Sequence, residues 1–169
     1  MKQNQHGFSL VELLIVVLTI AIIAVIAIPN MLAARRSANE GSAISSLRSL
    51  HSAQSTYQTS VGAGNYAGTD GGPADTAGLA ALASAGLIDS VLAAGMKSGY
   101  NFSGAITLAG AGTPATFFFT ANPVSTSGIT QSGTRRYSIT QMGFIGYDYY
   151  NLGTAFTAAT SASATPLSN

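Results

Sequence analysis

Three residues near the start of the chain have types and a spacing that could do chemistry. Gly7 directly precedes Phe8, and Glu12 follows four residues later, which is about one turn of a helix. A peptidase that cut after Gly7 would leave Phe8 as a new terminal amine close to the Glu12 carboxylate. The spacing therefore favours proteolytic processing and an ion pair over catalysis. The partner of Glu12 is either this new terminus or a group on another molecule.

The residues that follow form a long apolar run with one carboxylate in it. Residues 8–28 number 21, and Glu12 is the only charged side chain among them. As a helix this run would span ~30 Å, enough to cross a bilayer. A carboxylate there costs roughly 2.5–3.5 kcal/mol, and the nearest basic residues, Lys2 and Arg35, lie beyond reach on the same helix. We therefore expect a partner from outside the helix.

Residues 1–7 do not form an ordinary secretory signal. They are polar and contain one lysine, and the apolar run continues into polar sequence without a small-residue cleavage site after it. We therefore predict that residues 1–7 are a leader peptide and that the apolar run stays in the mature chain.

The segment Gly-Phe-Ser-Leu-Val-Glu at 7–12, followed by an apolar helix and Pro29, resembles the class III leader and N-terminal helix of type IV pilins and type II secretion pseudopilins. The resemblance is strong over residues 7 to about 58 and weak afterwards. It implies that Gly7 is the last leader residue and Phe8 the methylated terminus. It also implies that Glu12 registers each subunit against its neighbour's N-terminus, and that Pro29 kinks the helix.

The same resemblance implies partners and a location. The partners are a prepilin peptidase and methyltransferase, an inner-membrane assembly platform, the lipid bilayer before assembly, and further copies of the chain joined through their N-terminal helices. The chain would cross the bacterial inner membrane once and then enter a cell-surface pilus or a periplasmic pseudopilus. A pilus subunit is the preferred function and a type II secretion pseudopilin the alternative. A membrane-anchored binding domain that never polymerises is a third hypothesis.

The elements needed to position these residues define an α+β, pilin-like fold. Residues 8–28 form the transmembrane and filament-core half of one long helix, kinked near Pro29, and residues 29–58 form an amphipathic half. Apolar residues recur in this second half at three- to four-residue spacing. They are Ile44, Leu47, Leu50, Ala53 and Tyr57. This stripe should pack on a small antiparallel sheet.

The remaining residues predict a head and a tail. Residues 59–153 contain a loop, a short helix near 79–89 with Asp75 or Thr76 as its N-cap, and runs typical of strands. These strand-like runs cover residues 100–108, 115–121, 136–140 and 144–148. Residues 154–169 are mostly alanine, serine and threonine, so we expect a flexible tail.

Composition argues against several other classes of protein. Only 8% of the 169 residues are charged and the formal net charge is +1, which suits packing against copies of the same chain and not binding to a polyanion. The chain has no cysteine, so it can form neither a disulfide nor a thiolate metal site. We predict no cofactor and no enzymatic activity.

A few other side chains allow chemistry but have simpler explanations. His51 lies beside the apolar stripe and is expected to pack there, not to act as a base. Asp70 and Asp75 could contribute oxygens to a calcium ion, but they lack the alternating carboxylates of a dedicated loop and are better explained as solvated turn residues.

Two further groups lie near the end of the sheet. The pair Arg135 and Arg136 could contact DNA, but two arginines neutralise few phosphates, so we do not expect nucleic acid as a partner. A set of aromatic side chains follows the last predicted strand and should pack on the sheet or on a neighbouring subunit. It consists of Phe144, Tyr147, Tyr149 and Tyr150.

Overall fold

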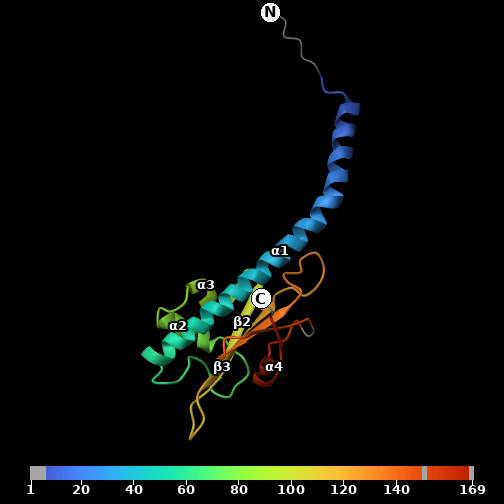
Figure 1. Ribbon diagram of the computed structural model, residues 1–169. Coiled ribbons are helices and arrows are strands. Elements are labelled where there is room, and N and C mark those ends of the chain that lie inside the picture. The colour runs from blue at the N-terminus through green and yellow to red at the C-terminus, as the bar shows by residue number, and fades with distance from the viewer. Residues whose placement is uncertain (1–6, 150–151, 168–169) are drawn as a thin grey trace, which may run out of the picture. The chain divides into compact units, whose positions relative to one another are not determined.

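The computed structural model describes residues 7–149 and 152–167, and it begins with one long helix followed by a small sheet (Figure 1). The helices are α1 (Leu10–Ser60), α2 (Ala77–Ser84), α3 (Ser90–Ala93) and α4 (Ala158–Ala162). The strands are β1 (Met96–Lys97), β2 (Tyr100–Thr107), β3 (Thr116–Pro123), β4 (Arg136–Thr140), β5 (Ile145–Asp148) and β6 (Thr165–Pro166). The predicted α+β class is confirmed. The chain forms two compact parts, up to Arg35 and from Arg36 onward.

The first part is the N-terminal half of α1. Helical structure continues through Pro29, although proline has no amide hydrogen to donate to the carbonyl of Val25. Polar side chains in this half bond to their own backbone. The Thr19 hydroxyl donates to the Ile15 carbonyl at 2.8 Å and the Asn30 amide to the Ile26 carbonyl at 3.2 Å. The kink near Pro29 stays a prediction.

The second part is built on the C-terminal half of α1, which lies along one face of the sheet (Figure 1). The predicted stripe supplies the buried residues Leu47, Leu50 and Ala53, together with Ala43 one turn earlier. They pack against apolar side chains from the inner face of the sheet. These include Phe102, Phe117, Phe119, Ala121, Tyr137 and Ile139. The prediction that the sheet packs on this half of the helix is confirmed.

The sheet is a meander in which each strand pairs with the next and all pairs are antiparallel. The register places Phe119 opposite Gly104 on β2 and opposite Ile139 on β4. A Cβ at Gly104 would clash with the ring of Phe119 and lie 2.7 Å from the Phe118 carbonyl. Only glycine therefore lets the Phe119 ring pack this closely against β2.

The short helices begin where aspartates can accept amide hydrogens. Asp75 Oδ1 accepts from the Ala77 amide at 2.9 Å at the start of α2, while Thr76 occupies the N-cap position without a side-chain bond. Asp89, at the end of the predicted helix, instead caps α3 by accepting from the Leu92 amide at 2.6 Å. The single helix expected near 79–89 is thus two helices separated by a turn.

The flexible tail expected at 154–169 is not what its described part shows. Residues 158–162 form α4 and residues 165–166 pair with β5 as β6. Phe156 is 2% exposed, and the guanidinium carbon of Arg136 lies 4.1 Å from its ring centroid. The buried ring of Phe156 on the outer face of the sheet and Leu167, which packs against the core, anchor a segment whose other residues are mostly small.

Candidate assembly site

The N-terminal site begins with the residues that start α1. The Glu12 Oε2 atom accepts the Ser9 amide at 2.9 Å, and the Ser9 hydroxyl accepts the Val11 amide at 3.3 Å. Glu12 makes its half of a Ser-x-x-Glu capping box, whereas the Ser9 hydroxyl accepts from Val11 and not from the Glu12 amide. Both bonds satisfy amides that have no partner inside the helix. Within a single chain, Glu12 therefore has a local partner that our sequence analysis missed. The pattern at 9–12 would have indicated it. Neither of these bonds brings a positive charge to the carboxylate.

The processing residues lie in open space. A Cβ at Gly7 would meet no atom within 4 Å, and its backbone is not left-handed. Packing within the chain therefore does not require glycine at this position. Phe8 is 85% exposed, so no packing within the described chain covers it. Residues 1–6, the rest of the predicted leader, lie outside the described residues. Cleavage after Gly7 and methylation of Phe8 stay predictions.

The apolar side chains in the N-terminal half of α1 are exposed in the single chain. In the described part of the chain, α1 is the one helix long and apolar enough to cross a membrane, and its most apolar window of 18 residues is not buried. Large apolar side chains from Leu10 to Ile28 are more than half exposed. Such a surface requires lipid or other helices around it.

A second polar site, which our sequence analysis missed, joins α1 to the start of β4. Glu40 is 5% exposed, although the sequence places it in a polar stretch of the helix. One carboxylate oxygen accepts the amide and the hydroxyl of Thr134, both at 2.7 Å. The other accepts the Arg135 guanidinium at 2.9 and 3.1 Å and the Tyr137 hydroxyl at 2.9 Å. We call these four residues the Glu40 clamp.

The clamp holds its carboxylate ionised. Burial alone would raise the pKa of Glu40, but the hydrogen bonds from Thr134, Tyr137 and Arg135 outweigh burial and lower this pKa below its usual value. Burial and the bond to Glu40 together raise the pKa of Tyr137. Two neighbouring contacts extend the clamp along the 125–135 loop. Arg36 donates to the Gln131 side chain at 2.8 Å and Asn39 to the Ser132 carbonyl at 2.9 Å.

The arginine pair considered for DNA is engaged within the chain. Arg135 belongs to the clamp and lies 5.6–5.9 Å from the ring centroids of Tyr137, Tyr147 and Tyr149. Arg136 is buried, and its guanidinium lies 2.8 Å from an Asp148 carboxylate oxygen. These contacts support a structural role for both arginines.

The aromatic set is divided by the structure. The rings of Tyr147 and Tyr149 meet edge to face with centroids 5.4 Å apart. Phe144 is instead 70% exposed, on the turn before β5. Tyr150 lies outside the described residues. Only part of the set therefore packs on the sheet.

The remaining candidates have packing or turn roles. His51 is half-buried, with its ring centroid 5.8 Å from that of Phe117 and Nε2 3.2 Å from the Gln141 carbonyl. Asp70 Oδ1 accepts the Leu108 amide at 2.9 Å, and Asp75 Oδ2 accepts the Thr69 hydroxyl at 2.6 Å. These bonds explain both aspartates as loop residues. Among the residues described, no three histidine or carboxylate side chains gather into a possible metal site.

Comparison with known proteins supports the assignment of the N-terminal segment. Residues 2–28 match the family model described as the prokaryotic N-terminal methylation motif. Over 56 residues the chain is 46% identical to the type IV wide pilus major component PilA4 of Thermus thermophilus. That match covers 33% of this chain and 43% of the relative, so it spans less than half of either protein. No solved structure matches the chain.

A long helix with an exposed apolar half, whose other half carries an antiparallel sheet, agrees with the predicted pilin-like α+β fold. The resemblance to the type IV pilin family, predicted from residues 7–12, is confirmed by the methylation motif and by the PilA4 relative.

Proposed function

We propose that the chain is the structural subunit of a type IV pilus-like filament, inserted in the inner membrane as a prepilin. The observation that carries this proposal is the exposed apolar half of α1, which begins with a capped carboxylate. Cleavage after Gly7 and methylation of Phe8 would prepare the subunit, and the N-terminal helices would polymerise in the filament core.

The free energies of burial and of charge pairing explain why Glu12 would matter to assembly. Lipid covers the apolar helix about as well as other helices do, so hydrophobic burial alone gives little drive to leave the membrane. Pairing the Glu12 carboxylate with a neighbour's terminal amine removes the cost of an unpaired charge in an apolar medium. Such a pair also fixes the axial step between subunits, a registry role known for other buried polar groups.

The cap at Ser9 helps this pairing. It holds the Glu12 carboxylate at the N-terminal end of α1, where the helix dipole favours a negative charge. The same end is where an incoming terminal amine would dock. One carboxylate oxygen bonds to Ser9, so the other is available to the amine.

The alternative is a pseudopilin of a type II secretion system. One feature of the sequence keeps this alternative open. Many pilins close their C-terminal region with a disulfide, and this chain has no cysteine with which to form one. Both functions rest on the same polymer physics. Electron micrographs of the producing cells separate them, because a pilin gives long surface fibres. For a membrane-anchored binding domain that does not polymerise, the described part of the head offers no group of metal-ligating side chains.

The decisive variant is Glu12→Gln. Glutamine keeps a side-chain oxygen for the Ser9 amide, so the helix cap survives while the charge is lost. We expect at least a tenfold fall in filament yield, with unchanged prepilin level and leader cleavage. Ser9→Ala is the matched control, since it weakens the cap and keeps the charge, and it should retain most of the yield. Wild-type yield from Glu12→Gln would refute the registration role.

Processing is tested separately by mass spectrometry of the protein extracted from membranes. The proposal requires a mature chain that begins at Phe8 and carries one added methyl group. A terminus at any other residue would contradict the assignment of Gly7 and Phe8, whatever the outcome for Glu12.

A further inference from the structure

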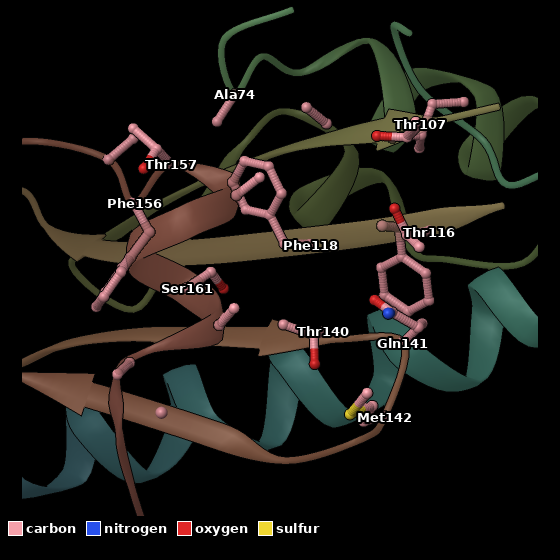
Figure 2. A pocket seen from close by; sticks show the side chains of 18 of the residues that line it. Ala74, Thr107, Thr116, Phe118, Thr140, Gln141, Met142, Phe156, Thr157 and Ser161 are labelled. Atoms are coloured by element: carbon pink, nitrogen blue, oxygen red, sulfur yellow. The ribbon is translucent and has the colours of Figure 1, made fainter. Parts of the chain in front are cut away.

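The face of the sheet turned away from α1 carries a cavity of about 760 Å³ (Figure 2). Its floor is the outer side of the sheet, with Phe118 near the centre and Thr116 and Thr140 beside it. The segment around α4 forms one wall, and the loop at residues 71–74 forms another. Figure 2 shows Phe156, Thr157 and Ser161 of the α4 segment on one side of this space. A cavity of this size holds a small organic molecule.

The lining excludes charge. Every side chain that lines the cavity is uncharged, and most are apolar, including Phe118, Phe156, Met142 and Phe144. Arg136, which lies against the lining residue Phe156, is paired with Asp148. Asp70 and Asp75 flank the lining loop at residues 71–74, and both accept hydrogen bonds from within the chain. A charged ligand would lose its hydration here without gaining a partner of opposite charge. The cavity therefore suits an uncharged ligand.

One polar group in the lining has no partner. Ser161 is 6% exposed, and its hydroxyl makes no hydrogen bond in the described structure. Among the described residues, one other buried side-chain oxygen makes no hydrogen bond, the hydroxyl of Ser138. Ser138 on β4 lies opposite Gly146 on β5, and Gly146 lines the cavity. Buried hydroxyls nearly always have a hydrogen-bond partner. The Ser161 oxygen is shielded from solvent in the described structure, so its hydroxyl would meet a ligand only after rotation about the Cα–Cβ bond.

We propose that this cavity binds an uncharged, mainly apolar small molecule whose polar group bonds to the Ser161 hydroxyl. Aromatic and aliphatic groups of the ligand would pack on Phe118 and Phe156. At the mouth, the exposed side chains of Met142 and Phe144 would close over it. A ligand there would join the α4 segment to the loop at residues 71–74. This site lies wholly within the head and does not depend on the proposed assembly function.

The probe for this site is 2-naphthol, an uncharged aromatic alcohol at neutral pH that carries one hydroxyl group. Binding is measured by equilibrium dialysis of the full chain in lipid nanodiscs, with empty nanodiscs as the blank for partition into lipid. The fluorescence of 2-naphthol reports its concentration, and the chain contains no tryptophan to interfere. We expect saturable binding to the protein. We expect no saturable binding of 2-naphthoate, which has the same rings and a negative charge.

Two alanines of α4 give a matched pair of variants. Ala162 is exposed and lines the cavity, whereas Ala159 is exposed and lies outside the lining. Ala162→Phe should fill the space and weaken 2-naphthol binding at least tenfold, while Ala159→Phe should bind as the wild type does. Equal binding by both variants would overturn the proposal. A second outcome would also overturn it: the wild type shows no saturable binding of 2-naphthol, and Ala162→Phe lowers the filament yield. The cavity would then be a contact between copies of the chain.

Ser161→Ala tests the polar contact. It should weaken 2-naphthol binding about fivefold, in line with the loss of one neutral hydrogen bond. Because the hydroxyl has no partner in the described structure, the variant should keep the thermal stability of the wild type. An unchanged affinity would remove Ser161 from the site. A lower Tm with unchanged affinity would show instead that the hydroxyl has a structural partner.

Discussion

At the scale of single residues, the two carboxylates of α1 act in opposite settings. Glu12 lies in an exposed, apolar half and is satisfied only by its own helix end. Glu40 is buried and accepts five hydrogen bonds from three residues of the loop and strand that follow β3. The first carboxylate thus bonds only within the first turn of its own helix, and the second is committed to the fold of the head.

Glu40→Gln should destabilise the head by about 3 kcal/mol. The amide keeps the shape of the side chain, but it leaves the Arg135 charge unpaired and replaces one acceptor by a donor. Urea denaturation followed by circular dichroism measures the change in the free energy of unfolding. Asp89→Asn is the control, because Asp89 is an exposed carboxylate and asparagine caps a helix equally well. A Glu40→Gln variant as stable as the control would show that the clamp adds nothing.

The clamp should also make the stability of the head depend on pH. Its hydrogen bonds lower the pKa of Glu40 in the folded state below the usual 4.5. A lowered pKa gives stability that is present above the unfolded-state pKa and is lost as the pH falls through the folded-state pKa. The difference in unfolding free energy between the wild type and Glu40→Gln should be constant from pH 7 to about pH 5. Below about pH 4.5 it should shrink. A difference that stays constant down to pH 3 would contradict the lowered pKa.

The sequence could reveal Glu12 but not the role of Glu40. Glu12 stands out because its apolar surroundings are adjacent in the chain. The partners of Glu40 lie 94–97 residues away, and its own neighbours are polar. No local pattern distinguishes a buried carboxylate from a solvated one in such a stretch. Its pairing depends on the fold of the whole head.

At the scale of elements, the four longer strands were predictable from runs that contain aromatic and β-branched residues. The four predicted runs agree with β2, β3, β4 and β5 to within two residues at each end. The missed strands, β1 and β6, have two residues each, too few to carry a pattern. The tail was misjudged for a different reason. Its composition resembles that of a disordered segment, but one aromatic residue and the local cap at Thr157 give it structure.

Phe156→Ala should release the C-terminal segment from the sheet and cost about 3 kcal/mol of head stability. The variant loses the buried ring and its contact with the Arg136 guanidinium. Hydrogen exchange of the amides at 156–163 should accelerate together with the loss of stability. Phe144→Ala is the matched control, because it removes the same side chain from an exposed position. Slow exchange in Phe156→Ala would show that α4 and β6 hold the segment without the ring.

At the scale of the whole molecule, the division of burial explains how one chain serves two environments. The buried residues begin at Glu40 and continue through the head, whereas the apolar side chains before Ile28 have no partner within the described part of the chain. The core of the head therefore takes nothing from the N-terminal half of α1. Under the proposed assembly function, the N-terminal half would pass from lipid to a bundle of like helices without a change in the core of the head.

This division predicts that a chain shortened to residues 36–169 folds alone and stays soluble without detergent. It keeps the buried stripe of α1, the Glu40 clamp and the complete sheet, and it loses the exposed apolar run. Its free energy of unfolding should lie within about 1 kcal/mol of that of the head in the full chain, the difference coming from fraying at the new helix end. Urea denaturation of both proteins measures it, and sedimentation velocity should show a monomer. A shortened chain that fails to fold, although Glu40 and its partners are present, would mean that the N-terminal half supplies stability to the head. The two environments of the chain would then be coupled through α1.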